Sequence, residues 1–207
     1  MSPRIFDLIK GRRSIRKYSS KEVPRDILFN ILEAARWAPS AHNAQPWRFI
    51  VITERSLKRK LAEQMAGEWT KDMTRNGVPR DTREKLAKAS VKQFTDAPVL
   101  IVACLTMEDM DTYPDRRRMT YEHIMAVQSL AASIQNILLA ACSEGLGACW
   151  FCAPLFCQDA VRRVLGIPSN VEPQALITLG YPSEKPAPPP RKSLREIIYM
   201  NYWGEKA

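Results

Sequence analysis

Three arginines and a serine lie within five residues near the start of the chain. The run Arg12-Arg13-Ser14-Ile15-Arg16 follows Gly11, a glycine placed to end a short helix. Guanidinium groups match phosphate oxygens in bidentate geometry, and a serine hydroxyl adds a neutral donor. Like charges held this close repel one another, and a bound anion offsets that repulsion. The loop therefore suggests an anion site, with a basic but solvated turn as the alternative.

A second polar loop, residues 39–47, carries Ser, His, Asn and Gln side chains between two prolines. Amide side chains offer both donors and acceptors, so two of them in a rigid loop can recognise a planar ring that has the same mixed pattern. The alternative is an ordinary helix-to-strand turn whose amides are solvated.

Together, the two loops resemble the opening motifs of the FMN-dependent nitroreductase family. Arg-Arg-Ser-Ile-Arg-Lys-Tyr (residues 12–18) is similar to the family's first motif, and Pro-Ser-Ala-His-Asn-Ala-Gln-Pro-Trp (residues 39–47) to its second. Later segments agree in order and spacing: Gly145–Trp150, Leu179–Pro182 and Arg191-Lys192. The resemblance spans nearly the whole chain.

The resemblance implies a homodimer of interlocked protomers, with two FMN molecules at the interface. The residues that would hold the phosphate and ribityl chain are Arg12, Arg13, Ser14, Arg16, Arg191 and Lys192. The residues that would come from the partner to cover the ring are Pro39, Ser40, Ala41, Asn43 and Gln45. The residues that would pass the flavin N5 edge are Trp150, Phe151, Cys152 and Ala153.

The implied reaction passes hydride from NAD(P)H through flavin N5 to a nitroaromatic, quinone or similar conjugated acceptor. Because the flavin carries this chemistry, no catalytic side chain is assigned. The chain has no Gly-x-Gly-x-x-Gly segment after a strand, which fits a family whose two substrates share one pocket.

Two departures from the family pattern keep alternatives open. Cys152-Ala153 stands where many members carry Glu-Gly or Gly-Gly, and only Asn76 is a candidate for the usual mid-chain asparagine. Residues 65–80 are more similar to the flavin-binding C-terminal domain of enzymes that build deazaflavin coenzymes. That likeness implies an FMN-dependent reductase of a deazaflavin-type or other anionic precursor, and a flavin-storing or flavin-degrading protein also stays open.

Hydrophobic spacing places these loops between helices and strands. We expect helices at Met1–Gly11, Pro24–Ala38, Ser56–Phe94 with a break at Asn76–Pro79, Met119–Ser143, Gln158–Leu165 and Ser193–Tyr199, and strands at Trp47–Thr53, Pro98–Leu105, Leu146–Phe151 and Gln174–Gly180. Strands separated by helices predict an α+β fold, a helix-wrapped sheet in a single domain over residues 1–207. The resemblance implies a mostly antiparallel sheet and exchange of an arm from about residue 182 onward.

Composition narrows the other function classes. The chain has 207 residues and 31 Lys+Arg against 22 Asp+Glu, so 31 − 22 gives +9. This excess admits nucleic acid, an acidic membrane face or an anionic ligand. A basic nucleic-acid-binding module is the different-class alternative, but aromatic residues do not alternate with the basic ones as a stacking surface requires. We therefore expect no nucleic-acid partner, and the basic run Arg116–Arg118 is interpreted as a solvated face or a lid for an acidic substrate.

The cysteines and the apolar runs bear on compartment and metal. Five cysteines, an odd number, fit a reducing cytoplasm better than a disulfide framework. Cys149-x-x-Cys152 has no second ligand pair at zinc spacing, so no metal site is predicted. Ala97–Leu105 and Ile137–Cys142 are the most apolar unbroken runs and are shorter than the ~20 residues of a membrane helix, so no membrane partner is expected.

Overall fold

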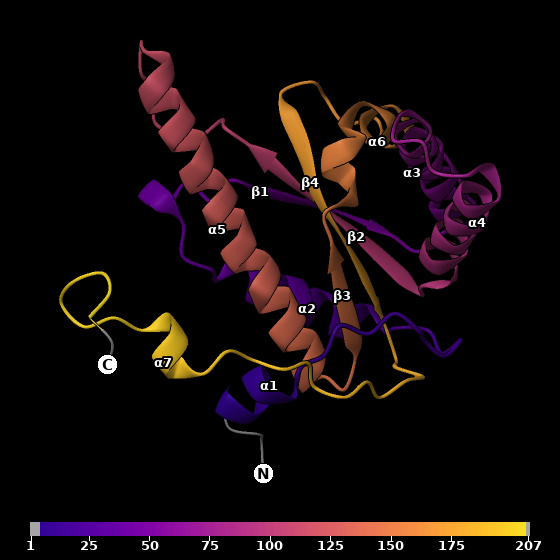
Figure 1. The fold of residues 1–207 in the computed structure, drawn as a ribbon, viewed down its shortest axis with the longest axis horizontal. Helices are drawn as coiled ribbons and strands as arrows, with labels where there is room; N and C mark the ends of the chain where they lie inside the picture. The colour runs from indigo at the N-terminus through magenta and orange to yellow at the C-terminus, as the bar shows by residue number, and fades with distance from the viewer. Residues whose placement is uncertain (1–4, 206–207) are drawn as a thin grey trace.

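A four-stranded antiparallel sheet forms the centre of the computed structural model, which describes residues 5–205 (Figure 1). The strands are β1 (Trp47–Ile52), β2 (Val99–Thr106), β3 (Gly147–Phe151) and β4 (Val171–Gly180), in the spatial order β1-β2-β4-β3. Every neighbouring pair is antiparallel. The predicted α+β class with an antiparallel sheet is therefore confirmed.

Helices cover both faces of this sheet (Figure 1). They are α1 (Ile5–Gly11), α2 (Arg25–Arg36), α3 (Arg55–Arg75), α4 (Arg80–Asp96), α5 (Arg116–Ser143), α6 (Gln158–Leu165) and α7 (Leu194–Ile197), with 3₁₀ turns η1 (Ala41–Asn43) and η2 (Ala153–Phe156). The expected break in the long charged segment is the turn between α3 and α4, where Gly77 takes a φ of +71°.

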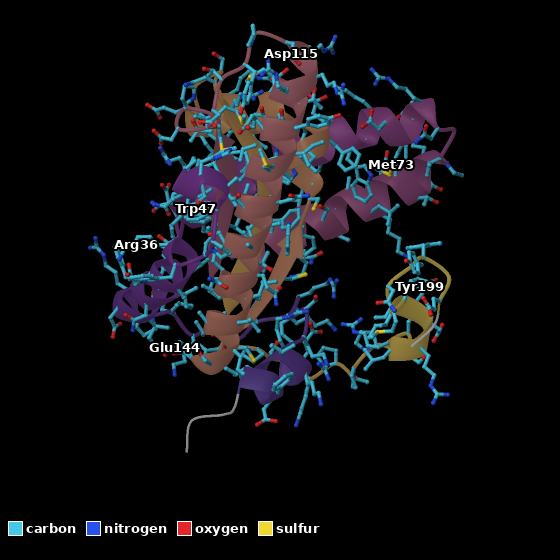
Figure 2. The ribbon with its side chains drawn as sticks, turned by 90° about the vertical axis from the view of Figure 1, so that its left-hand side faces the viewer. Arg36, Trp47, Met73, Asp115, Glu144 and Tyr199 are labelled. Carbon is cyan, nitrogen blue, oxygen red and sulfur yellow. The ribbon has the colours of Figure 1, made fainter. Side chains whose placement is uncertain are left out.

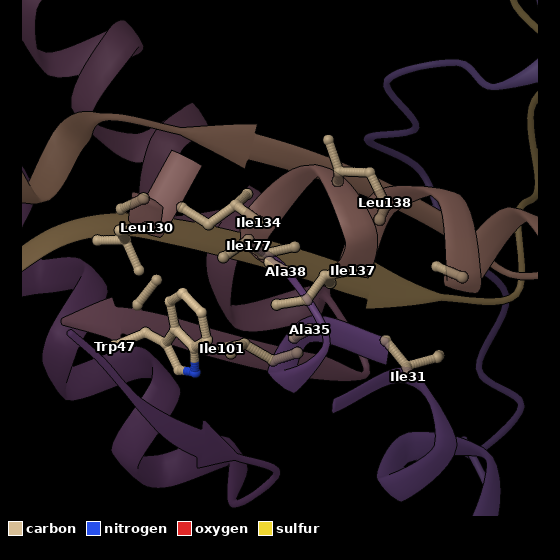
Figure 3. Close-up of a cluster of buried hydrophobic side chains, with 14 of the residues drawn as sticks. Ile31, Ala35, Ala38, Trp47, Ile101, Leu130, Ile134, Ile137, Leu138 and Ile177 are labelled. Carbon is tan, nitrogen blue, oxygen red and sulfur yellow. The ribbon is translucent and has the colours of Figure 1, made fainter. Parts of the chain in front are cut away.

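The central strand β2 explains this arrangement, because all eight of its residues are buried. Successive side chains of a strand point to opposite faces. Ile101 and Leu105 therefore pack with α2 and α5 on one side, while Leu100 and Val102 pack with α3, α4 and α6 on the other. Figure 3 shows the first of these cores.

The longest helix begins earlier than the hydrophobic spacing predicts. Asp115 caps α5 by accepting a hydrogen bond from the Arg118 backbone N–H at 2.9 Å, so Arg116–Arg118 form its first turn. The side chains of Arg116–Arg118 are exposed, as expected of a solvated face. The apolar pattern starts only at Met119, and the cap determines the true start.

Helix α5 is the one helix in residues 5–205 that is long and apolar enough to cross a membrane by length and composition alone. An 18-residue window has mean hydropathy 1.5, and 44% of that window is buried. Most of this helix was predicted from its periodicity, but no unbroken apolar run marks it as long enough to cross a membrane, because polar residues interrupt its apolar positions. In the fold, its buried face packs on the sheet and α2.

The segment after β4 leaves the sheet as an extended arm, drawn in yellow in Figure 1. Tyr199, labelled in Figure 2, belongs to this arm and lies apart from the layered helices. The helix expected at Ser193–Tyr199 is shorter, because α7 spans only Leu194–Ile197. A capping box formed by Ser193 and Glu196 begins it.

Candidate functional site

The basic loop is held against the edge strand β3. Ser14 forms a parallel bridge with Ala148, and the Ile15 backbone N–H donates to the Ala148 carbonyl at 3.0 Å. The Ile15 side chain is buried over Gly147, where a Cβ atom would lie only 2.7 Å from the Ile15 side chain. The loop therefore behaves as a short extra strand whose position depends on a glycine.

An extended segment presents alternate residues on one side, so Arg12, Ser14 and Arg16 face the same way. The Arg16 guanidinium lies 6.0 Å from the centroid of the Phe151 ring. Burial raises the pKa of the Cys149 thiol, while Arg16, a hydrogen bond with Ser14, and Arg12 lower it. All three residues therefore lie near Cys149 of β3, and the Arg16 guanidinium reaches Phe151, which packs on the face of the sheet that carries α3 and α4.

Arg13 is engaged differently from the other two arginines. Its guanidinium donates to the carbonyls of Lys10 at 2.6 Å and Arg12 at 2.7 Å. The loop is also fastened by Glu184, whose carboxylate accepts from the backbone N–H groups of Arg16 at 2.7 Å and Lys17 at 3.1 Å. Sequence reasoning did not select Glu184, and its distance of 168 positions from Arg16 leaves no local signal.

An apolar cavity of about 710 Å³ lies on the same side of the sheet. Phe151 and Ala153 line it together with α3, α4 and η2. Its aromatic walls are Trp69, Phe94, Phe151 and Phe156, and its polar residues are Asp72, Arg75, Asn76, Ser90 and Gln93. The basic loop and this cavity thus meet at Phe151.

The segment 150–153 divides between the two faces of the sheet. Trp150 packs against the core formed with α2 and α5, and its buried indole N–H has no hydrogen-bond partner. Cys152 is exposed. Only Phe151 and Ala153 of the four predicted residues line the cavity, whereas Asn76, which had no matching motif, lines it too.

The second polar loop adopts a constrained backbone before β1. His42 and Asn43 both have φ of 54° and Gln45 has 47°, values that non-glycine residues seldom adopt. The Gln45 backbone N–H donates to the Ser40 hydroxyl at 3.1 Å, and the Ala41 backbone N–H donates to Ser129 Oγ on α5 at 3.1 Å. Pro39 is exposed at the loop's start.

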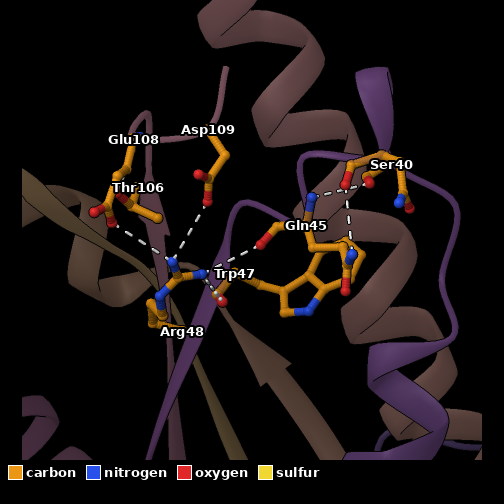
Figure 4. Close-up of polar contacts among 8 residues, drawn as sticks. Ser40, Gln45, Trp47, Arg48, Thr106, Glu108 and Asp109 are labelled. Carbon is orange, nitrogen blue, oxygen red and sulfur yellow. Dashed lines mark hydrogen bonds and ion pairs between the residues drawn. The ribbon is translucent and has the colours of Figure 1, made fainter.

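Arg48 braces the end of this loop (Figure 4). Its guanidinium donates to the carbonyls of Gln45 at 3.3 Å and Trp47 at 2.9 Å. Glu108 and Asp109 lie 3.6 and 3.8 Å from the same guanidinium. These contacts tie the loop to the segment that follows β2.

The two predicted loops do not meet within one chain. The second loop leads into β1 at one edge of the sheet, and the basic loop lies beside β3 at the other edge. Arg191 and Lys192 are exposed on the arm, and within residues 5–205 neither forms an ion pair or a side-chain hydrogen bond. A single protomer therefore assembles only the Arg12–Arg16 and Phe151–Ala153 parts of the predicted site.

The family model described as the nitroreductase family matches residues 9–181. The chain belongs to the nitroreductase family. This nitroreductase-family protein is accordingly an oxidoreductase, and the resemblance found in its motifs is confirmed.

Three comparisons describe its relatives. A Methanothermobacter thermautotrophicus protein provisionally named NADH dehydrogenase/NAD(P)H nitroreductase is 36% identical over 184 residues, which cover 88% of this chain and 79% of that protein. A Desulfovibrio desulfuricans structure, provisionally named a nitroreductase and in complex with FMN, has a TM-score of 0.72, 26% identity and coverage of 98% and 99%. A BluB-like flavoprotein from Clostridium difficile has a TM-score of 0.78, 25% identity and coverage of 97% and 100%.

Proposed function

We propose that this nitroreductase-family protein is an FMN-dependent oxidoreductase that passes hydride from NAD(P)H, through flavin N5, to a nitroaromatic, quinone or similar conjugated acceptor. The observation that carries the proposal is the junction at Phe151, where a three-arginine loop meets an aromatic cavity. FMN has a phosphate at one end, which suits the arginine loop, and a planar ring at the other, which suits the aromatic cavity. The relatives' names, which include NAD(P)H and FMN, support the same cofactors.

The donor set fits the phosphate of FMN. Within the described part of the chain, Arg12, Arg13 and Arg16 form no ion pair with a carboxylate, so their positive charge is available to an anion. Arg12, Ser14 and Arg16 would hold the phosphate and ribityl chain, Arg13 would add positive charge nearby, and Arg191 or Lys192 would approach from the arm.

The ring would lie along Phe151, Cys152 and Ala153, at the mouth of the aromatic cavity. Bound FMN supplies the two-electron hydride chemistry. The protein's part is to orient the ring, to exclude water with apolar walls, and to place positive charge where the reduced cofactor is anionic.

We propose a homodimer to complete the site. The loop that carries Pro39, Ser40, Ala41, Asn43 and Gln45 lies at the sheet edge opposite the basic loop, so a second copy is needed to bring the two together. Large apolar side chains are exposed where such a copy would pack: Phe29 and Trp37 at α2, Tyr121 and Ile124 on α5, and Leu194, Ile197, Met200, Tyr202 and Trp203 on the arm. The arm from about residue 182 would extend to the partner protomer. We propose that residues 1–207, including this arm, form a single domain.

The cavity favours a conjugated acceptor over an anionic one. Four aromatic rings line it, and its cation, Arg75, is 3.2 Å from the Asp72 carboxylate that lines the same space. The net charge offered to an anionic deazaflavin-type precursor is therefore small.

All five cysteines are free thiols, which suits the reducing cytoplasm that we propose as the protein's location.

The visible spectrum of the purified protein tests the cofactor. We expect flavin absorption, or its appearance on addition of FMN to the apoprotein, together with NAD(P)H oxidation that accelerates with menadione or a nitroaromatic. Failure to bind added FMN overturns the proposal. Faster turnover of a deazaflavin precursor than of either conjugated acceptor would assign the anionic substrate class instead.

A further inference from the structure

Three ionisable side chains from distant parts of the sequence converge beside the second polar loop. His42 comes from η1, Asp111 from the segment between β2 and α5, and Glu122 from α5. One ligand atom from each lies within 4.8 Å of the other two. No part of the proposed flavin chemistry uses this group.

Glu122 is the unusual member of this cluster. Its residue is 3% exposed, and its buried Oε2 accepts no hydrogen bond. The nearest cationic candidate, His42 Nε2, lies 3.3 Å away, which exceeds the 2.7–2.9 Å typical of a charge-assisted N–H···O bond. A buried carboxylate without a donor is costly, and such groups in native proteins commonly indicate a bound ion or water.

We propose that Glu122 and His42, with Asp111, bind a divalent transition-metal ion. Metal–ligand bonds of about 2.0–2.1 Å in tetrahedral geometry separate two ligand atoms by roughly 3.3–3.4 Å, and the Nε2–Oε2 distance is 3.3 Å. The Asp111 carboxylate lies 3.8 Å from the other ring nitrogen and is exposed, and a ligand atom of Asp111 lies within 4.8 Å of those of His42 and Glu122, close enough to share one ion. Water would complete the coordination.

The ligand set selects the class of metal. An imidazole nitrogen combined with carboxylate oxygens suits Zn²⁺ and its transition-metal neighbours, whereas Mg²⁺ and Ca²⁺ prefer oxygen ligands alone. An ion here would tie η1 to α5 and to the segment after β2, and so would hold the positive-φ residues His42 and Asn43 in place. Metal binding at this cluster does not depend on FMN.

A second histidine–carboxylate pair provides the internal comparison. His123 Nε2 lies at hydrogen-bond distance, 3.0 Å, from Glu172 Oε2, and that oxygen also accepts from Gln174 Nε2 at 2.9 Å. Because this carboxylate is satisfied by protein donors, the pair has no need of a metal. His123→Ala is therefore a matched control for His42→Ala.

Isothermal titration calorimetry tests the proposal. The untagged full-length protein is stripped of metal with EDTA and titrated with ZnCl₂ and, separately, with MgCl₂. We expect one Zn²⁺ per chain, much weaker Mg²⁺ binding, and a rise in melting temperature with Zn²⁺. Glu122→Gln and His42→Ala should each weaken Zn²⁺ binding by at least about 10-fold and abolish the rise, while His123→Ala should change neither.

Two outcomes would overturn the site: absence of Zn²⁺ binding by the wild-type protein, or unchanged affinity in His42→Ala. Substitution of the buried Glu122 could prevent folding, whereas His42 is partly exposed on a loop and its replacement by alanine should leave the fold intact. The His42→Ala variant therefore tests the site even if Glu122→Gln does not fold. Circular dichroism of each variant checks that point.

Discussion

At the scale of single residues, the basic loop combines residues that hold its conformation with residues that we propose bind the FMN phosphate. Arg13 donates to two carbonyls of its own segment, and Ile15 is buried in the body of the protein. Arg12, Ser14 and Arg16 lie near Cys149, and among residues 5–205 neither arginine side chain forms an ion pair with a carboxylate. Alternation along an extended segment thus places the side chains of Arg12 and Arg16 on the same side of the loop.

Replacement of these arginines should weaken FMN binding. Under the proposed phosphate assignment, Arg12→Ala and Arg16→Ala would each remove a charge-assisted hydrogen bond, and we expect a loss of about 1.5–3 kcal/mol. That loss is roughly a 10- to 150-fold rise in Kd, measurable by quenching of flavin fluorescence.

Lys17→Ala is the matched control, because Lys17 is exposed in the same loop and carries the same charge. Its affinity should stay close to the wild-type value. Unchanged affinity in both arginine variants would contradict the phosphate assignment.

At the scale of elements, the site depends on how closely the basic loop approaches β3. The approach is possible because Gly147 has no side chain beneath Ile15. Tyr18 fixes the end of the loop, since its hydroxyl lies 2.6 Å from Thr178 Oγ1 on β4. These contacts hold the loop against the sheet.

Gly147→Ala should disturb both folding and cofactor binding. The added Cβ would lie 2.7 Å from the Ile15 side chain, and such overpacking typically destabilises a protein by about 1–3 kcal/mol. Urea unfolding and FMN titration of the same variant measure the two effects.

Gly11→Ala serves as the comparison, because a Cβ at Gly11 meets no atom within 4 Å. We expect this variant to fold and to bind FMN like the wild type. Equal behaviour of the two alanine variants would show that the contact between loop and strand is unimportant.

At the scale of the whole molecule, association should depend on the C-terminal arm. Tyr202 and Trp203 are 78% and 90% exposed, an unusual state for large aromatic residues that a partner's surface would relieve. Tyr202→Ser combined with Trp203→Ser should shift the protein from dimer toward monomer in light scattering after size exclusion.

Leu86→Ser, at an exposed position of α4, should leave the mass unchanged in that experiment. A wild-type protein that is monomeric at micromolar concentration, or an arm variant that remains fully dimeric, would argue against exchange of the arm.

Alkaline pH should lower the stability of the folded chain. Burial raises the pKa of Cys104 to about 12 and that of Cys157 to about 11, against 9.0 for an ordinary thiol. Above pH 9 the unfolded chain releases thiol protons that the folded chain retains, so the free energy of unfolding falls as pH rises toward 11–12.

Guanidinium unfolding at pH 8, 9 and 10 measures this slope. Cys104→Ala should flatten the slope, because the variant removes one of the groups that titrate differently in the two states. A slope that Cys104→Ala leaves unaltered would show that burial of this thiol is not its cause.

The elements that local interactions specify were largely predictable. The apolar run of β2, the periodicity of α2 and the break near Gly77 each depend on neighbouring residues, and the structure confirms them. The start of α5 was misplaced because a side-chain cap at Asp115, rather than an apolar residue, begins that helix. The family motifs also survive as short contiguous segments, which is why the sequence alone pointed to the family.

The sequence by itself therefore determined that residues 12–18 and 39–47 are family motifs, and which helices and strands flank them. Only the tertiary structure placed Trp150 on the face of the sheet away from the cavity, joined Glu184 to the basic loop, and set the two loops at opposite sheet edges. It alone brought His42, Asp111 and Glu122 together. These relations depend on strand order and on side-chain packing between residues far apart in the chain, and no local pattern encodes such contacts.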